Sequence, residues 1–407
     1  MKRMQEKFEA VFPGSFDPFQ NGHLSTVISF LKLNPKAFLY IVIGVNDEKK
    51  NSQTFSTDEK IFLINETMPK KYLKRIKIVP YSKIIANYLY EQNIQMYVKG
   101  VRDQKDFEYE SWIATVNALF SGNPKTMLVP QTNPELTNVS SSNFKNFVKW
   151  GLKATSFAPA LTREALELKL RGQLLIGVTG GIGAGKSTFS RSIERISGKN
   201  GNADKVKVYH INLDDLTKVI YSSDPMPRFL KIREKVAKRF DKDARKRFGK
   251  SAKLMMPDSS IDVHALGSIA FSSKEKLNEL TEMVMEAILY LLRRKLEELG
   301  KGIFLIEGAN FVEQNLTDLV NENIIHIKAN RKAQEERLKG RGLNDEQIQR
   351  RLDFQLTDNE RMKVIKEKQK KEKHRLFMQV SSLGKTDAEE IYRRLQEEYE
   401  TRNKIIR

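Results

Sequence analysis

The chain has 407 residues, 40% of them hydrophobic and 30% charged, and this length predicts two or three soluble domains. The absence of cysteine excludes disulfides and thiolate metal sites, and no apolar run approaches the ~18 residues that span a bilayer. The short charged N-terminus lacks the apolar core of a signal peptide. We therefore expect a cytoplasmic protein with no membrane-spanning segment.

The formal net charge of +20 is concentrated in two segments. Residues 228–253 hold 12 Lys/Arg against 3 Asp/Glu (net +9), and residues 361–376 hold 8 against 2 (net +6). Such segments can bind nucleic acid, or they can be solvated helix faces beside sites for polyanionic nucleotides. Because aromatic residues that would stack on bases are sparse in both, we favour solvated faces and do not expect a nucleic-acid partner.

Strands and helices alternate along the first part of the chain. Five β-rich apolar runs predict strands at Phe8–Pro13, Ala37–Val45, Ile76–Tyr81, Met96–Lys99 and Thr126–Pro130. A helical pattern follows Gly22, and Ser56–Glu59 has the form of a capping box that opens the next helix. A last helix is predicted over Pro159–Arg171, with Gly172 at its end. The alternation indicates a mostly parallel sheet with right-handed crossovers.

The second part of the chain, from Gln173, repeats this alternation. Strands are predicted at Gln173–Val178, Val206–Ile211, Gly302–Ile306, Ile324–Lys328 and Leu376–Val380. A long helix is expected over Lys274–Leu299, a loop or extended helix over Lys238–Lys253, and a solvated helix over Lys363–His374. We therefore expect a second α/β domain.

The run Pro13–His23 directly follows the first predicted strand. It is a turn that leads into a helix whose first turn carries His23, near the positive end of the helix dipole, where an anion is stabilised. Taken alone, the run also fits a capping loop with a structural histidine.

Three further segments occur with this run: Val98–Arg102, Asp106–Glu110 and Val139–Ser142. With them the run resembles nucleotidyltransferases of the [HT]-x-G-H class, and most closely the bacterial-type phosphopantetheine adenylyltransferase family. Gln20 at the [HT] position and Lys99 in place of an arginine depart from that pattern.

The resemblance implies adenylyl transfer, in which the phosphate of 4′-phosphopantetheine attacks the α-phosphate of ATP. His23 would donate to that α-phosphate, while Ser15 and Lys49 hold the attacking phosphate, with Lys50 as the alternative to Lys49. Lys99 is implied to bind the second substrate, and the other residues implied to bind ATP are Phe16, Arg102, Glu110, Ser140, Ser141 and Ser142. The serines can also cap the helix that follows them.

Residues Gly180–Ser187 match the P-loop pattern G-x-x-x-x-G-K-[ST], between an apolar strand and a helical pattern. Glycines allow backbone N–H groups to surround phosphate oxygens, and the helix N-terminus adds positive charge. We expect Lys186 to neutralise the β/γ-phosphates and Ser187 to be a ligand of Mg²⁺. The other residues expected to bind ATP are Gly181, Ile182, Gly183, Ala184, Gly185 and Thr188.

This P-loop also resembles the opening of the dephospho-coenzyme A kinases, a likeness that covers roughly residues 173–395. The segments that follow the family in order are His210–Asp214, Asp262–Phe271, Phe311–Glu313, Arg337–Arg341 and Arg351–Gln355. The chain departs from the family pattern at Asn212, Val263 and Met285–Glu286, which replace the first Asp of an Asp-x-Asp pair, an Arg and a His-Pro.

The kinase resemblance implies transfer of the γ-phosphate of ATP to the ribose 3′-hydroxyl of dephospho-coenzyme A. Asp214 would accept or orient the proton of that hydroxyl, although an Asp at a strand end is also a common helix cap. Arg341, with Arg337 as the alternative, would close over the transferred group. Asn344 and Gln347 are predicted to cap the next helix.

We therefore predict an α/β protein with a Rossmann-like nucleotidyltransferase domain in residues 1–171 and a P-loop kinase domain in residues 172–407, both with mostly parallel sheets. The two implied reactions are consecutive, so we favour a bifunctional coenzyme A synthase that uses ATP and Mg²⁺ and can form a homo-oligomer through its N-terminal domain. One alternative is a kinase with a degenerate, ligand-binding N-terminal half. Another is a nucleic-acid-binding protein regulated by nucleotide.

Overall fold

The structure, a computed structural model, describes residues 8–45, 52–119, 124–131, 133, 140–152, 154–199, 205–308, 310–370, 372–381 and 385–405. The chain divides into two compact units, each described by itself. The first comprises residues 1–171 with 372–374 and 400–407, and the second residues 172–371 with 375–399. Within the described ranges, no helix is both long and apolar enough to cross a membrane.

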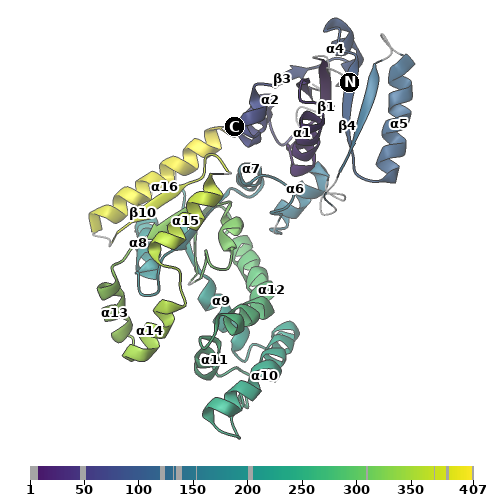
Figure 1. Cartoon of the computed structure of the whole chain (residues 1–407). Helices are drawn as coiled ribbons and strands as arrows, with labels where there is room; N and C mark the ends of the chain where they lie inside the picture. The colour runs from purple at the N-terminus through teal and green to yellow at the C-terminus, as the bar shows by residue number, and fades with distance from the viewer. Residues whose placement is uncertain are drawn as a thin grey trace. The chain divides into compact units, whose positions relative to one another are not determined.

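The first unit is built on an all-parallel sheet with the order β3-β2-β1-β4-β5. Figure 1 labels β3, β1 and β4 of this sheet. Its strands are β1 (Glu9–Gly14), β2 (Phe38–Gly44), β3 (Ile76–Tyr81), β4 (Met96–Val101) and β5 (Lys125–Pro130). All five predicted strands are confirmed, with ends that differ by one or two residues. The strand order reverses between β1 and β4, and in such sheets ligands bind in the crevice beyond the carboxyl ends of these strands.

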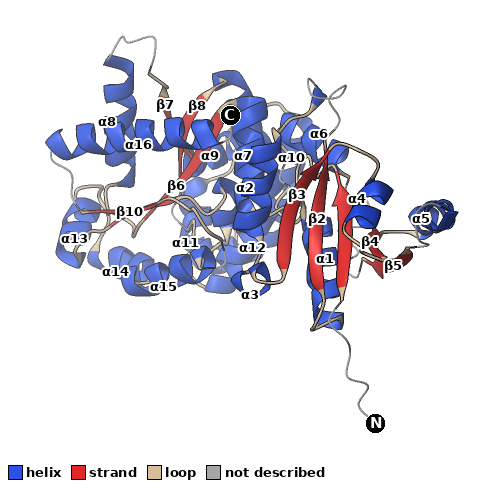
Figure 2. Cartoon of the chain, turned by 90° about the horizontal axis from the view of Figure 1, so that it is seen from above, coloured by secondary structure: helices blue, strands red, loops and turns tan. Residues whose placement is uncertain are grey.

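Helices cover both faces of this sheet, as the strands and helices in Figure 2 show. The helices of this unit are α1 (Asn21–Leu33), α2 (Thr57–Thr67), α3 (Lys70–Leu73), α4 (Ile85–Glu91), α5 (Gln104–Leu119), α6 (Ser141–Lys149) and α7 (Ala160–Arg171). Because side chains alternate along a strand, Ala10 and Phe12 of β1 pack with Phe30 of α1. Val11 faces the other way and packs with Leu89 of α4.

The second unit has a separate all-parallel sheet with the order β10-β9-β6-β8-β7. Its strands are β6 (Gln173–Thr179), β7 (Val208–Asn212), β8 (Gly302–Glu307), β9 (Ile324–Ile327) and β10 (Phe377–Val380), which confirms the remaining five predicted strands. β6 lies at the centre of the sheet and pairs with β8, which in turn pairs with β7. The residues at the carboxyl ends of these three strands therefore meet at one edge.

A helical layer packs on one face of this sheet, and α8 contacts β6, β7 and β8. The helices are α8 (Lys186–Lys199), α9 (Leu213–Tyr221), α10 (Pro227–Phe248), α11 (Val263–Ala270), α12 (Lys274–Leu299), the 3₁₀ helix η3 (Leu316–Val320), α13 (Arg331–Lys339), α14 (Asp345–Asp353), α15 (Asp358–Gln369) and α16 (Lys385–Ile405). Phe240 of α10, Val284 of α12 and Phe304 of β8 belong to one apolar core. The predicted helix over Lys274–Leu299 is confirmed.

Both basic segments contain helices with a buried face. α10 continues to Phe248, so the first part of Lys238–Lys253 is an extended helix. The helix predicted over Lys363–His374 is found in part, because α15 runs from Asp358 to Gln369 and ends before His374. From Lys363 onward most of its residues are exposed or half-buried, whereas Ile365 is buried, as is Arg361 just before the predicted start. The Arg361 guanidinium pairs with the Glu313 carboxylate at 2.8 Å, so one positive charge of this basic segment is neutralised inside the protein.

Candidate active sites

The P-loop joins the central strand β6 to helix α8. Gly183 has φ +73° and Gly185 has φ +98°, backbone conformations that side chains with a Cβ rarely adopt. A Cβ on Gly183 would also lie 2.9 Å from the carbonyl oxygen of Gln334 in α13. Gly181 and Ala184 are buried in the loop, whereas Thr188 is exposed on α8. The sequence motif thus forms the strand–loop–helix that binds phosphate in other proteins.

Lys186 and Ser187 occupy the first turn of α8. The Lys186 side chain is buried, and its Nζ donates to the carbonyl oxygens of Gly180 at 2.9 Å and Gly181 at 3.1 Å. Burial lowers the pKa of Lys186, and the charges of Glu307 and Asp214 oppose that shift. The Ser187 hydroxyl donates to Glu307 Oε1 at 2.6 Å.

Glu307, the last residue of β8, is the central acid of this site. Its second oxygen, Oε2, lies 2.8 Å from Nε2 of His210 on β7, and both side chains are almost fully buried. Burial would raise the pKa of Glu307, but the hydrogen bonds from His210 and Ser187, with the charge of Lys186, hold it below its usual value. Glu307 is therefore a charged acceptor beneath the P-loop.

Asp214 lies in the first turn of α9, at the end of β7. It is not the helix cap, because Asn212 is the N-cap and its side chain accepts from the Asp214 backbone N–H at 2.8 Å. The Asp214 side chain is exposed, yet the protein atoms packed around it raise its pKa. The charge of Lys186 opposes this rise. A carboxylate with a raised pKa is suited to proton transfer.

Helix α13 places Arg337 against the P-loop. Its guanidinium donates to the carbonyl oxygens of Gly183 at 2.9 Å and Ala184 at 3.0 Å. The backbone N–H of Ile182 donates to the Gln355 side chain at 2.7 Å. Arg341 is exposed in the turn after α13, and the predicted Asn344–Gln347 capping box at the start of α14 is confirmed. The arginine that contacts the loop in this structure is thus the predicted alternative.

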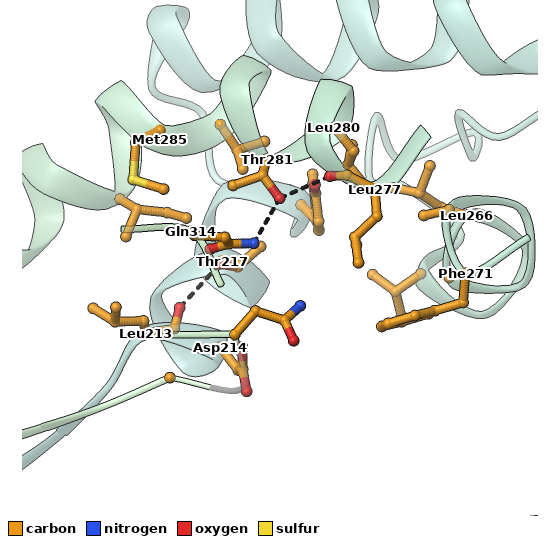
Figure 3. A pocket seen from close by; sticks show the side chains of 18 of the residues that line it. Leu213, Asp214, Thr217, Leu266, Phe271, Leu277, Leu280, Thr281, Met285 and Gln314 are labelled. Carbon is orange, nitrogen blue, oxygen red and sulfur yellow. Dashed lines mark hydrogen bonds between the residues drawn. The ribbon is translucent and has the colours of Figure 1, made fainter. Parts of the chain in front are cut away.

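A cavity of about 230 Å³ begins at Asp214 and extends between α9, α11 and α12 (Figure 3). Its walls are mostly apolar and include Leu213, Leu266, Phe271, Leu277, Leu280 and Met285. Gln314 supplies a polar group inside, and its amide donates to the Thr281 hydroxyl at 2.9 Å. Met285, where the sequence departs from the kinase pattern, therefore faces this cavity.

In the first unit, His23 lies in the first turn of α1. Its Nδ1 accepts from the backbone N–H of Gln20 at 3.2 Å, so the neutral ring carries its hydrogen on Nε2. The rings of Phe16 and Phe19 pack around it, with centroids 5.1 and 5.6 Å away. Burial, with the charge of Arg102, lowers the pKa of His23 to about 4. His23 is thus a neutral hydrogen-bond donor near pH 7.

His23 faces a second cavity of about 230 Å³, at the switch between β1 and β4. Predicted site residues that line it are Phe16, His23, Lys99, Arg102, Glu110, Ser140 and Ser141. Two acids from α5 pair with the basic side chains: Glu110 lies 3.4 Å from Lys99, and Asp106 lies 3.2 Å from Arg102. Asp106 is a lining residue that the predicted set lacks.

The remaining predicted residues of this unit differ in their placement. Ser140 is the N-cap of α6 and accepts from the Asn143 backbone N–H at 3.1 Å, which confirms the capping role. Ser15 and Ser142 are exposed and are not among the residues that line the cavity. Lys49 and its alternative Lys50 lie outside the described residues.

Comparison with known proteins gives two family matches. Residues 11–147 match the cytidylyltransferase-like family, and residues 228–369 match the dephospho-CoA kinase family. A phosphopantetheine adenylyltransferase of Syntrophomonas wolfei is 34% identical over 161 residues, which cover 40% of this chain and 96% of that protein. One of Oenococcus oeni is 32% identical over 163 residues, 40% of this chain and 99% of that protein. The chain belongs to the phosphopantetheine adenylyltransferase family.

Membership of the adenylyltransferase family rests on the first unit, which holds the His23 cavity. The dephospho-CoA kinase match lies in the second unit, from α10 to the end of α15. A solved dephospho-CoA kinase from Campylobacter jejuni aligns with 55% of this chain and 98% of its own, at 18% identity and a TM-score of 0.32. Both predicted families are therefore found, each in the predicted part of the chain.

The oxygen donor that the second unit offers to Mg²⁺ is the Ser187 hydroxyl of the P-loop. Within the part of the chain that the structure describes, no cluster of three or more His, Cys, Asp or Glu side chains could hold a metal by itself. Mg²⁺ in nucleotide sites is usually held by one or two protein oxygens together with substrate phosphates. Ser187 fits this role, because its hydroxyl donates a hydrogen bond to Glu307 and keeps its lone pairs for a cation.

Proposed function

We propose that the chain catalyses the last two steps of coenzyme A biosynthesis. In the first, ATP and 4′-phosphopantetheine give dephospho-CoA and diphosphate; in the second, ATP and dephospho-CoA give CoA and ADP. One observation carries the proposal: a single chain combines an adenylyltransferase-family cavity around His23 with a P-loop and a nearby acid, Asp214, in a unit that matches dephospho-CoA kinases. The product of the first family is the substrate named by the second.

In the first step, a phosphate oxygen of 4′-phosphopantetheine attacks the α-phosphorus of ATP. The bond from the α-phosphorus to the bridging oxygen breaks, and diphosphate leaves with the electron pair. His23 Nε2–H donates to an α-phosphate oxygen as charge builds on it, while Arg102 at the end of β4 adds positive charge. Lys99 on β4 binds the second substrate. Ser15 and Lys49 hold the attacking phosphate. Phe16, Glu110 and the serines at 140–142 complete the ATP site.

In the second step, the ribose 3′-oxygen of dephospho-CoA attacks the γ-phosphorus of ATP, and the bond to the β–γ bridging oxygen breaks. Asp214 takes the hydroxyl proton, which its raised pKa favours. Backbone N–H groups of residues 181–188 surround the phosphates, and Lys186 neutralises the β/γ-phosphates. Arg341 closes over the transferred group from the turn after α13.

When bound, Mg²⁺ supplies charge neutralisation of the phosphates in this step. Ser187 would hold it, oriented by Glu307. The apolar cavity would receive the acceptor nucleotide, because Asp214, the group that takes the proton, is one of the residues that line it. The proposal also includes a cytoplasmic location and a homo-oligomer formed through residues 1–171.

The test is product analysis with purified chain, ATP, Mg²⁺ and 4′-phosphopantetheine, followed by chromatography with mass detection. We expect CoA, diphosphate and ADP, with dephospho-CoA as the intermediate. Conversion of added dephospho-CoA without any reaction of 4′-phosphopantetheine would instead support the single-activity kinase. If neither substrate reacts and the chain binds RNA with a steep salt dependence, the proposal is overturned in favour of nucleic-acid binding.

A further inference from the structure

Glu307 is held at both carboxylate oxygens by groups from different elements. Oε1 accepts from the Ser187 hydroxyl of α8 at 2.6 Å, and Oε2 lies 2.8 Å from Nε2 of His210 on β7. The side chains of His210 and Glu307 are 6% and 5% exposed. Such a chain of buried hydrogen bonds restricts the orientation of every member. His210 has no role in the reaction proposed above.

We propose that His210 is a positioning residue of the phosphoryl-transfer site, which orients Ser187 toward Mg²⁺ through Glu307. This inference rests on the proposed kinase function. His210 fixes one carboxylate oxygen, so that the other is directed at the Ser187 hydroxyl. Ser187 then donates its hydroxyl hydrogen bond to Glu307, which leaves the lone pairs of its oxygen for the cation. Partners behind a metal ligand commonly set its orientation in this way.

A competing interaction explains why Glu307 needs to be held. The charge of Lys186 acts on Glu307, because the two groups are neighbours beneath the loop. Lys186 Nζ instead donates to backbone carbonyls of Gly180 and Gly181, and Glu307 is directed to Ser187. Without a partner for Oε2, the carboxylate would gain by turning to the lysine, since an unsatisfied buried charge is costly.

The residues of β7 next to His210 give a reason for the hydrogen bond between His210 and Glu307. His210 and Asn212 are two residues apart on β7, and Asn212 is directly opposite Glu307 in the sheet register. Asn212 is neutral, and its side chain caps α9. The acid opposite Asn212 therefore comes from the adjacent strand β8, and His210 on β7 hydrogen-bonds to it.

The test compares three single variants of the full chain. His210→Phe keeps a ring but removes the donor, whereas in His210→Gln the amide Nε2 can reach the place of the histidine Nε2. Tyr209→Phe is the matched control, because Tyr209 is adjacent on the same strand, points to the other face and stacks on Phe304. Calorimetric titration with ATP at low and high Mg²⁺ measures the Mg²⁺-dependent part of binding. Lys186→Ala, measured in parallel, reports the ATP site of the first unit.

We expect His210→Phe to weaken the Mg²⁺-dependent part of ATP binding roughly 10–100-fold and to raise the Mg²⁺ concentration for half-maximal kinase rate similarly. His210→Gln should recover most of this loss, and Tyr209→Phe and adenylyl transfer in all three variants should match wild type. A folded His210→Phe with unchanged Mg²⁺ dependence overturns the proposal, as does a folded His210→Gln no better than His210→Phe. Failure of the proposed kinase function can be told apart from failure of this inference, because in that case the wild-type chain would not phosphorylate dephospho-CoA.

Discussion

At the scale of single residues, the two sites use basic side chains in different electrostatic settings. His23 is surrounded by aromatic rings and lies near Arg102, which keeps its ring neutral near pH 7. Lys186 is buried, but Glu307 and Asp214 partly offset the effect of burial on its pKa. The first site thus offers a neutral hydrogen-bond donor, which suits an α-phosphate that builds up charge during the reaction. The second site offers a positive charge, which suits a triphosphate that is already fully charged.

Substitution of these two residues should separate the two activities. We expect His23→Ala to slow adenylyl transfer roughly 100–1,000-fold, because a donor to the charged transition state is lost, and to leave phosphorylation of added dephospho-CoA unchanged. Lys186→Ala should have the reverse effect. Initial rates of diphosphate release and of ADP formation measure the two steps. An unchanged rate of diphosphate release in His23→Ala would remove the role given to that residue.

The pKa of His23 also predicts how the first unit responds to acid. The ordinary pKa is 6.5 and the folded value is about 4, so between these values the unfolded chain binds a proton that the folded chain does not. The stabilisation is fully present above the ordinary value and is lost as the pH falls toward 4. We therefore expect wild type to lose more stability than His23→Gln between about pH 7 and about pH 5.

Thermal unfolding followed by tryptophan fluorescence measures this, because Trp112 and Trp150 are the two tryptophans of the chain and both belong to the first unit. The variant can be less stable than wild type at every pH, because it loses packing. The informative quantity is therefore how the difference in stability between wild type and His23→Gln changes with pH. A difference that stays constant across this range would contradict the lowered pKa.

At the scale of elements, helix α13 and the turn after it carry two arginines in unlike positions. Arg337 holds two P-loop carbonyls, so Arg337→Ala should loosen the loop and raise the KM for ATP. Arg341 is exposed, and we expect Arg341→Ala to lower kcat by roughly tenfold or more with little change in KM, as for an interaction made only in the transition state. Steady-state kinase kinetics distinguish them. If Arg341→Ala changes only KM, Arg341 does not act on the transferred group.

The ten strands and the P-loop could be predicted because their signals are local. Apolar runs of the right length mark the strands, and eight consecutive residues define the loop. Glu307 was missed because its role depends on sheet register: it contacts Ser187 across 120 residues of sequence and His210 across 97. The available signal was an acid at the end of an apolar strand. The buried face of α15 was missed for a similar reason, because Glu313, the partner of Arg361, lies 48 residues away.

At the scale of the whole molecule, each proposed site is formed within one unit. Cleavage between Arg171 and Gly172, which follows α7 with φ +64°, should therefore give two pieces that each keep one activity. Residues 372–374 and 400–407 group with the first unit, so we expect fragment 1–171 to be the less stable of the two. Separate expression of 1–171 and 172–407, with activity and thermal unfolding assays, tests this. If either fragment is active only when mixed with the other, the sites are not independent.

The presence of two separate parallel sheets in one polypeptide fixes the ratio of the two sites in the cell. Every ribosome that finishes this chain delivers one copy of each site, so transcription and translation cannot change the ratio of the two enzymes. The steady-state amount of the intermediate is then set by the turnover numbers and affinities of the two sites. Selection on that amount can act on side chains within the sites, and a change of promoter strength would raise or lower both capacities together.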